Sequence, residues 1–594
     1  MSARPPTSYE FGPFRFDVAD RVLFRAGQSV TVTPKALELL LVLIQNRGRL
    51  VSKENLISRV WPDTFIEENN LAVHISTLRK ALGGNSDETE YIKTSPKRGY
   101  SFVAEVREEA ENESAVAKVR AVAVLPFKVI SSETGDDYLG VGMSDAIITR
   151  LSQISEIAVR PTSAVLKYAA REIDPVEAGR ELGVEAVLSG RVTKAGDQVR
   201  VTVQLVAIDN SLLWADKLDH SFTDVFTYED LISERVARAL NLKLTGEQID
   251  RLTKRHTVNS AAYWAYLKGR FYWGKRSPEG FKKAMEYFAY ASDKDPHYSL
   301  AYSGLADCHT LLNYYGSMPA SVGRANARPA ALKALEADEG LPEAHASMAL
   351  VRFWYDWDWS GAEIEFERAI ELNPAYATVH QWYCWYLVAM GRLDESEAEG
   401  KRALELDPLA PAINMALGKS YLFARCFEDS IRQCERTLEI DPNFIPARYF
   451  LAQAYEQKGN LEAALAQCSL AVKMSGSTPL GRAVLARAQA VAGQTGEAEG
   501  ALRELINLSE SGETYVPAYG IALIHLGLDD KTSALEWVNR AYDERFIWLV
   551  YLNVDPVWDG LRQEPGFKQL QQRMAFPDIR YPLSASGEGE GGER

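Results

Sequence analysis

The sequence predicts a multidomain, mainly helical protein. A strand-flanked helix-turn-helix and a small α/β domain precede a long array of helices. The chain has 594 residues, more than one hydrophobic core supports. Near the N-terminus, short runs that alternate apolar and polar residues surround three segments whose apolar residues have helical spacing. Farther along, a phrase ending in proline recurs every 34 residues. The hydrophobic share of 46% and the charged share of 25% are those of ordinary globular proteins.

The first expected domain spans residues 9–106. Alternating runs over 9–32 predict a small antiparallel sheet with turns at 12–13 and 26–27. Helices are expected from Thr33 (as N-cap), from Ser52 and over 69–82. The third helix has one apolar stripe, formed by Leu71, Ile75, Leu78 and Leu82. The phrase YIKTSPKRGYSFV predicts a hairpin with residues 96–99 at its tip.

The opposite face of the third helix is the candidate interface with double-stranded DNA. It carries side chains that can donate to phosphates, bond base edges or contact a thymine methyl, namely Asn70, Val73, His74, Ser76, Thr77 and Lys80. The same pattern is also typical of an ordinary solvated face. The helix-turn-helix context and the basic hairpin favour DNA binding, and the hairpin adds Lys97, Arg98 and Tyr100 to the candidates.

The distribution of charge restricts where DNA can bind. The whole chain has a net charge of −15, whereas residues 1–106 hold 14 Lys+Arg and 12 Asp+Glu. The first domain therefore carries +2 and the remainder −17. Because an acidic surface repels DNA, contacts are expected in the first hundred residues alone.

Residues 107–118 are polar and predict a linker, and residues 119–247 predict an α/β domain. Its signals are the buried-strand run AVAVLPF, a hairpin turning at 195–197 and a closing helix over 229–244. Gly140 and Gly142 form a weak G-x-G, and GMSDA lacks the last glycine of a hydrolase elbow. Ser144 is instead expected as a helix cap. No catalytic residue and no cofactor is predicted.

Residues 255–545 predict a solenoid. Prolines at 374, 408 and 442 end similar phrases at steps of 34 residues, the period of tetratricopeptide repeats. About seven units are expected, the second with an insertion at 316–327, followed by a C-terminal cap and disordered tail over 546–594. The aromatic residues of 353–360, with Trp382, Tyr383 and Trp385, fit either a pocket or packing between helices, and packing is favoured.

Several function classes are disfavoured. The five cysteines lie between Cys308 and Cys468 without paired spacing, which predicts reduced thiols and a cytoplasmic location. The N-terminus has no apolar signal region, and no stretch reaches the ~18 apolar residues of a membrane span. The lack of such a stretch predicts no membrane partner. No metal motif is present, so no metal is predicted.

Residues 9–106 resemble the OmpR/PhoB-type winged-helix domain through VTPKALELL, VHISTLRKAL and YIKTSPKRGYSFV. The resemblance implies that the third helix enters the major groove, with Val73, Ser76 and Thr77 facing bases, and His74 and Lys80 facing phosphates. It also implies that the hairpin acts as a wing whose Lys97 and Arg98 contact the backbone or minor groove. Many relatives have arginines where Ser76 and Thr77 stand, so direct readout of guanine is not expected there. CadC-like relatives continue into a transmembrane helix, whereas this chain continues into the charged linker.

Residues 119–247 resemble a TolB-like domain through VAVLPF, DDYLGVGMSDAIITRLS, VEAVLSGRVTKAGDQVRVTVQLV and SLLWADKLD. Together the resemblances imply a bacterial one-component transcription regulator whose repeats bind a protein or peptide. RNA polymerase and a second copy of the chain are further candidate partners. Two alternatives stay open: a repeat scaffold with a vestigial winged helix, and an enzyme hidden in the middle domain. The intact VHISTLRKAL phrase and the local charge favour the regulator.

Overall fold

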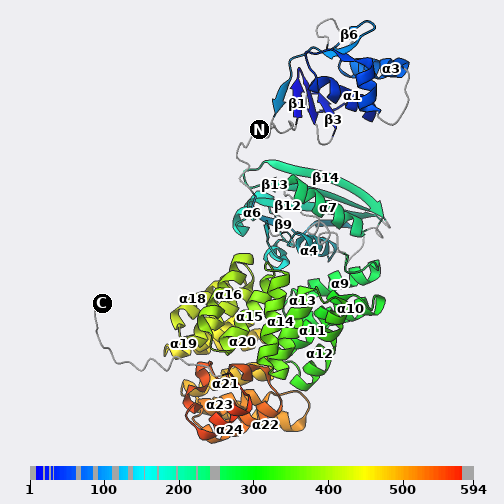
Figure 1. Cartoon of the computed structure of the whole chain (residues 1–594). Coiled ribbons are helices and arrows are strands. Elements are labelled where there is room, and N and C mark those ends of the chain that lie inside the picture. The colour runs from blue at the N-terminus through cyan, green and yellow to red at the C-terminus, as the bar shows by residue number, and fades with distance from the viewer. Residues whose placement is uncertain are drawn as a thin grey trace. The chain divides into compact units, whose positions relative to one another are not determined.

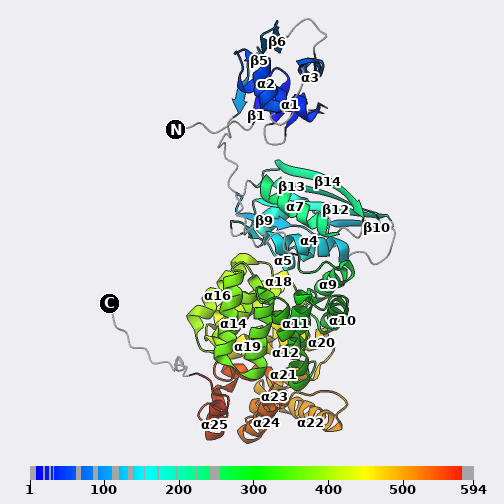
Figure 2. The ribbon, with the colours of Figure 1, turned by 45° about the vertical axis from the view of Figure 1, so that its right-hand side comes forward.

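The computed structural model (Figures 1 and 2) describes residues 8–17, 21–25, 28–30, 32–61, 68–83, 91–109, 119–131, 138–152, 154, 156–169, 171, 173–195, 198–221, 225–240 and 255–577. The chain divides into two compact units, residues 1–118 and 119–594. Each unit has its own hydrophobic core.

The first unit contains an antiparallel sheet of order β4-β3-β2-β1-β8. Its strands are β1 Ser8–Phe11, β2 Phe14–Asp17, β3 Val22–Arg25, β4 Gln28–Ser29 and β8 Arg107–Glu109. The predicted turn at 12–13 is confirmed, while residues 26–27 lie outside the described part. The prediction of a linker from residue 107 is wrong at its start, because β8 pairs with β1. An edge strand has a neighbour on one side only, so a polar run such as Arg107–Glu109 can form it.

Three helices and a second sheet complete this unit. The helices are α1 Pro34–Gln45, α2 Lys53–Val60 and α3 Glu68–Ala81, and the sheet has the order β5 (Val51–Ser52), β7 (Gly99–Phe102), β6 (Ile92–Ser95). The predicted cap of α2 is confirmed, since Ser52 Oγ accepts from the Asn55 amide at 3.3 Å. Thr33 stands at the N-cap of α1 but makes no side-chain cap bond. Proline at the first helical position removes one unpaired amide donor of the helix end, and the Ala36 amide donates to the Thr33 carbonyl at 3.0 Å instead.

The second unit begins with the predicted α/β domain. Its sheet has the order β11-β9-β12-β13-β14, and β10 also pairs with β12. The strands are β9 Ala121–Val124, β10 Lys128–Ser131, β11 Ala158–Val159, β12 Ala186–Ala195, β13 Gln198–Ala207 and β14 Leu212–Ser221. The helices are α4 Tyr138–Leu151, α5 Thr162–Val165, η1 Leu166–Tyr168, α6 Pro175–Leu182 and α7 Val225–Ala239. The predicted hairpin is confirmed by the pairing of Ala195 with Gln198, although its tip lies outside the described residues.

The prediction that Ser144 caps a helix is wrong. Helix α4 begins six residues earlier, and the buried Ser144 hydroxyl lies 2.8 Å from both the Leu125 and the Gly140 carbonyl oxygens. The nearby glycines serve packing, since a Cβ at Gly140 would lie 1.9 Å from the Phe127 carbonyl oxygen. Gly140 therefore brings α4 against the segment after β9, and Gly142 brings it against Leu267 of the first repeat helix.

The repeats form eight helix pairs within residues 260–543, one more than the sequence predicts. They are α9 Ser260–Trp273, α10 Pro278–Lys294, α11 Ser299–Tyr314, α12 Ala320–Ala337, α13 Pro342–Val351, α14 Trp359–Leu372, α15 Ala377–Ala389, α16 Leu393–Leu406, α17 Pro411–Phe423, α18 Phe427–Ile440, α19 Ile445–Gln457, α20 Leu461–Ser475, α21 Pro479–Val491, α22 Thr495–Ser511, α23 Ala518–Gly527 and α24 Lys531–Asp543. A turn of π-helix, η3 Arg352–Asp356, follows α13. The predicted insertion forms the turn before α12 and its first half.

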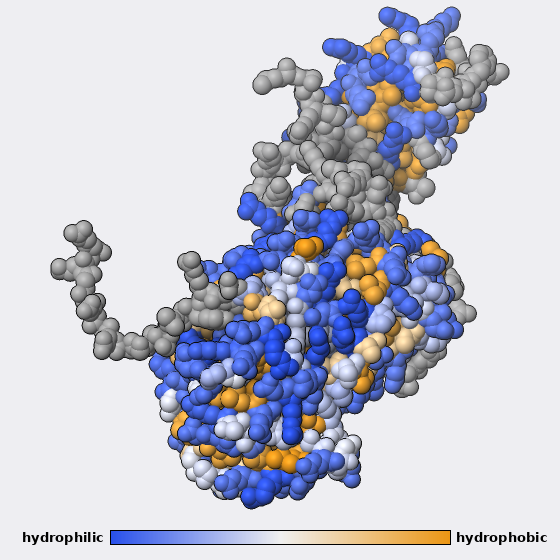
Figure 3. Space-filling view, turned by 60° about the horizontal axis from the view of Figure 1, so that its bottom comes forward, coloured by the Kyte–Doolittle hydropathy of each residue, from blue (hydrophilic) through white to orange (hydrophobic). Residues whose placement is uncertain are grey.

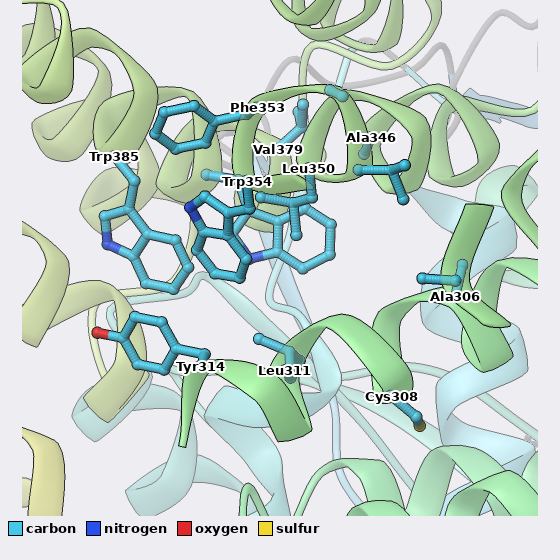
Figure 4. Close-up of a cluster of buried hydrophobic side chains, with 14 of the residues drawn as sticks. Ala306, Cys308, Leu311, Tyr314, Ala346, Leu350, Phe353, Trp354, Val379 and Trp385 are labelled. Carbon is cyan, nitrogen blue, oxygen red and sulfur yellow. The ribbon is translucent and has the colours of Figure 1, made fainter. Parts of the chain in front are cut away.

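The aromatic residues of 353–360 pack between helices, as favoured from the sequence (Figure 4). Tyr314 of α11 stacks on Trp354 of η3 and on Trp385 of α15, each at 5.4 Å between ring centroids. Four of the five cysteines are buried and Cys426 is exposed, and all five are free thiols. These rings and the four buried thiols therefore lie in the core of the repeats.

The α/β domain packs directly on the repeats within the second unit. Arg160 Nη1 donates to the Glu405 carbonyl at 2.7 Å, and Ser163 bonds the buried Asp407. On the face seen in Figure 3 hydrophilic residues dominate, with scattered apolar patches. Within the described ranges, the helices include none with the length and apolar character of a membrane span. The same ranges contain no group of three or more His, Cys, Asp or Glu residues suited to a metal ion.

Candidate nucleic-acid interface

Helix α3 is held by its apolar stripe and presents its other face outward. Leu71, Ile75 and Leu78 are buried in the core of the first unit. On the outward face Asn70, Ser76 and Lys80 are exposed. Val73 is 62% exposed. A branched apolar group in that position suits contact with a thymine methyl.

Two of the predicted side chains are only half exposed. The His74 ring packs on Trp61, with 5.2 Å between ring centroids. The Thr77 hydroxyl donates to the Val73 carbonyl at 3.0 Å. Its proton is therefore used inside the helix, and Thr77 can offer a base only its methyl group and an oxygen lone pair.

The wing is a tight hairpin with two cations at its tip. The Arg98 amide donates to the Ser95 carbonyl at 3.0 Å, and Lys97 has a φ of 60°. Proline followed by a residue of positive φ is the pattern of a type II turn, which prefers glycine where Lys97 stands. Gly99 is required, since a Cβ there would lie 1.9 Å from the Val51 carbonyl oxygen.

Tyr100 differs from the other predicted contacts. It lies in β7 opposite Val51 and is 7% exposed, within the core of the first unit. Alternation along the strand turns its side chain inward, away from a ligand of the wing. Lys97 and Arg98 are exposed, and so is Lys93 on β6, which the sequence reasoning missed.

Arg79 couples α3 to the hairpin, a role that the sequence reasoning also missed. Its guanidinium donates to the Ile92 carbonyl from Nε at 3.1 Å and from Nη2 at 2.6 Å, and to Thr94 Oγ1 at 2.7 Å. These bonds fix α3 relative to β6. Its place beside the buried Leu78 is the one sequence signal that it faces the neighbouring hairpin.

In the second unit the inner face of the repeats is occupied by the chain itself. The segment after α24 contains η4 Ile547–Tyr551, η5 Pro556–Leu561 and α25 Pro565–Arg573. Trp548 contacts Tyr314 of the second pair, Phe450 of the sixth and Tyr519 of the eighth, at 5.6, 6.2 and 6.1 Å between centroids. The predicted terminal cap is thus a segment that fills the groove of the superhelix.

One buried cation lies where this segment meets the repeats. Lys419 of α17 is 1% exposed, and its Nζ donates to the Tyr551 hydroxyl at 2.9 Å. The same Nζ lies 4.4 Å from the centroid of the Trp385 ring. Burial holds the pKa of Lys419 well below its usual range.

Three parts of the chain match known families. Residues 27–102 match "Transcriptional regulatory protein, C terminal", and residues 118–234 match "HilA/YgeH-like transcriptional regulator, second domain". Residues 415–479 match a tetratricopeptide repeat. The resemblance of the middle domain to TolB-like proteins stays a prediction.

Curated relatives share parts of this arrangement. The transcriptional regulator HilA of Salmonella typhimurium is 23% identical over 385 residues, which cover 64% of this chain and 66% of HilA, just under two thirds of its length. The transcriptional activator CadC of Escherichia coli is 29% identical over 118 residues, 20% of this chain and 23% of CadC. A Rhizobium meliloti protein provisionally named adenylate cyclase 3 is 28% identical over 240 residues, 39% and 40% of the two chains.

The chain therefore joins a winged-helix domain of the OmpR/PhoB type to a second domain of the HilA/YgeH type and to tetratricopeptide repeats.

Proposed function

We propose that this chain is a one-component, sequence-specific transcription regulator. In this role α3 enters the major groove of DNA, and the β6–β7 wing contacts the backbone or the minor groove. The observation that supports the role most is the outward face of α3, where an exposed valine and hydroxyl side chains stand on a helix anchored by a buried stripe. HilA is named a transcriptional regulator and CadC a transcriptional activator, which agrees with this role.

The proposed contacts follow the exposure of each side chain. Val73, Ser76 and Thr77 face the bases, and Lys80 faces phosphate together with the half-exposed edge of His74. Asn70 stands at the first turn of α3. On the wing, Lys97 and Arg98 contact the DNA, whereas the buried Tyr100 makes no contact.

We propose that the repeats bind a protein or peptide outside their inner groove. The segment with Trp548 already fills that groove. In the described repeats, several exposed apolar side chains lie on second helices of the pairs: Tyr290, Val322, Leu332, Ile364 and Leu470. RNA polymerase and a second copy of the chain are the partners to test first, by crosslinking followed by mass spectrometry. Crosslinks confined to the inner segment would contradict this placement.

The rival function is a repeat scaffold whose winged helix no longer binds DNA. The anchored α3 and the cations of the wing favour DNA binding instead. The regulator families matched by the first two domains favour a non-enzymatic role, and the adenylate cyclase name is that of the Rhizobium relative, not of this chain. We place the chain in the cytoplasm, because the bacterial chromosome that it would bind lies there.

Genome-wide mapping of bound DNA tests the proposal, since it yields the operator and the regulated genes together. Discrete sites with a shared motif are expected. A chain that crosslinks to no discrete site and shifts no duplex in a gel would favour the scaffold.

A further inference from the structure

The α/β domain of the second unit contains a large open cleft. Its volume is about 1300 Å³. One wall is the face of β12, β13 and β14 that α6 leaves uncovered. The other walls are the loop after β9, the η1 segment with the residues before α6, and the C-terminal end of α9. The cleft therefore combines the sheet of the α/β domain with the first helix of the repeats.

One row across the sheet places three cations in this cleft. Lys128 of β10 pairs with Arg191 of β12, Arg191 pairs with Thr202 of β13, and Thr202 pairs with Lys217 of β14. Directly paired residues point to the same face of a sheet. At the usual spacing of neighbouring strands the row spans about 14 Å. All three cationic side chains are exposed, and all three line the cleft.

Two more cations stand at the other walls. Arg171, which lies before α6, forms an ion pair with Glu181 at 3.9 Å, and Lys275 follows α9. Among the described residues that line the cleft, Asp216 is the one carboxylate. Asp216 belongs to the next row, whose side chains point to the opposite face, and it forms an ion pair with Arg235 of α7. Its charge therefore does not neutralise the row of cations.

This concentration of positive charge is unfavourable for the folded domain. Like charges placed directly opposite each other destabilise a sheet, and Lys128 and Arg191 are such neighbours. The chain beyond residue 106 is otherwise strongly acidic. A cleft lined by one sign of charge raises the local concentration of ligands of the opposite sign.

The cleft also offers apolar and aromatic surface. Phe127, Ile173 and Phe271 line it. Lys275 Nζ lies 4.8 Å from the centroid of the Phe271 ring, which places a cation and an aromatic face side by side. In the next row on the same face of the sheet, Gln204 donates to Ser189 at 3.2 Å and supplies neutral polar groups. Small-molecule sites typically have such mixed walls with a few convergent polar groups.

We propose that this cleft binds a small polyanion that carries an aromatic group, with nucleoside triphosphates as the chemical class. The phosphates lie along Lys128, Arg191 and Lys217, and the base packs toward Phe271 and Lys275. Binding here would give the α/β domain the role of a sensor between the winged helix and the repeats. This site extends the proposed function and does not depend on DNA binding.

Isothermal titration of the full chain with ATP and GTP tests the proposal, with inorganic triphosphate as a second probe. The variant carrying both Arg191→Gln and Lys217→Gln removes two cations of the row at exposed positions. Lys282→Gln is the matched control, since Lys282 is exposed on α10 and does not line the cleft. Circular dichroism and melting temperature verify that each variant is folded.

The wild type and the control should bind a nucleoside triphosphate with equal affinity, and the double variant should bind at least about tenfold more weakly. Inorganic triphosphate should bind more weakly than ATP, because it lacks the aromatic group. No binding at millimolar nucleotide, or unchanged binding by the double variant, would overturn the site. Equal affinity for inorganic triphosphate and ATP would overturn the assignment to nucleotides.

Discussion

The backbone at Lys97 allows the charge of the wing to be separated from its shape. Lys97 has a φ of 60°, where a residue other than glycine costs roughly 1–2 kcal/mol. Lys97→Gly removes the cation and this strain, whereas Lys97→Ala removes the cation and keeps the strain. Because glycine also loses more entropy on folding, by about 0.5–1 kcal/mol, Lys97→Gly should be as stable as the wild type or up to ~1.5 kcal/mol more stable. Lys97→Ala should remain close to the wild type.

Both variants should lose one phosphate contact. The slope of the logarithm of the binding constant for DNA against log salt should fall in magnitude by about 0.9 in each variant. The ratio of the affinity of the wild type to that of the variant should therefore shrink by roughly threefold to fourfold between about 50 and 200 mM salt. Fluorescence anisotropy of the full chain on one duplex, measured across a salt series, gives these slopes. Urea unfolding of residues 1–118, which have their own core, gives the stabilities. Slopes equal to that of the wild type in both variants would refute the placement of Lys97 on the DNA backbone. A slope lowered in Lys97→Ala alone would mean that turn shape, and not charge, is what matters.

Three further predictions concern α3, its link to the wing and the buried lysine. Thr77→Ala should weaken binding to the specific DNA site by roughly 1–3 kcal/mol and leave binding to a scrambled duplex unaffected. Equal losses of affinity for both duplexes, measured by fluorescence anisotropy, would contradict a base contact. Arg79→Ala should destabilise residues 1–118 by about 1–3 kcal/mol in urea, because the Ile92 carbonyl and Thr94 lose their donor. Arg59→Ala, at an exposed position of α2, is its control, and equal stability of the two variants would exclude the link. Lys419→Met removes an amine whose pKa in the folded protein is lowered by burial. Because of this lowered pKa, the unfolded wild type binds more protons than the folded one. The wild type therefore loses stability as pH falls from about 10.4 toward the folded pKa. The stability of the wild type relative to Lys419→Met should therefore rise with pH in that window, with a slope approaching about 1.4 kcal/mol per pH unit. A difference in melting temperature between the two proteins that stays flat from pH 8 to 10 would show that Lys419 titrates normally.

Local patterns predicted those parts of the fold that depend on sequence neighbours. The stripe of Leu71, Ile75 and Leu78 defined the buried side of α3, and the 34-residue period defined the repeats, because each pattern repeats the geometry of one helix or one helix pair. The prediction for Ser144 was wrong because it depends on a contact between segments that are separated in sequence. Gly140 lies against the Phe127 carbonyl, and this close approach lets α4 start before Ser144.

Long-range contacts account for the features that sequence reasoning missed. The occupation of the groove by Trp548 requires rings from three distant repeats, and no local pattern encodes that meeting. The same holds for Arg79, whose acceptors lie 13 and 15 residues away on another element. In the α/β domain, the row of Lys128, Arg191 and Lys217 exists only through the register of four strands.

The central claim is that the outward face of α3 distinguishes DNA sequences. Its most direct test is the ratio of affinities for a duplex taken from a mapped genomic site and for the same duplex scrambled. This ratio is compared between the wild-type full chain and the variant carrying both Val73→Ala and Thr77→Ala, at ~150 mM salt. A ratio of at least about 10³ for the wild type is expected, as for specific DNA-binding proteins. The double variant should lower it by at least about tenfold through weaker binding to the specific duplex alone. Equal affinity of the wild type for the two duplexes, or an unchanged ratio in the variant, would contradict the account.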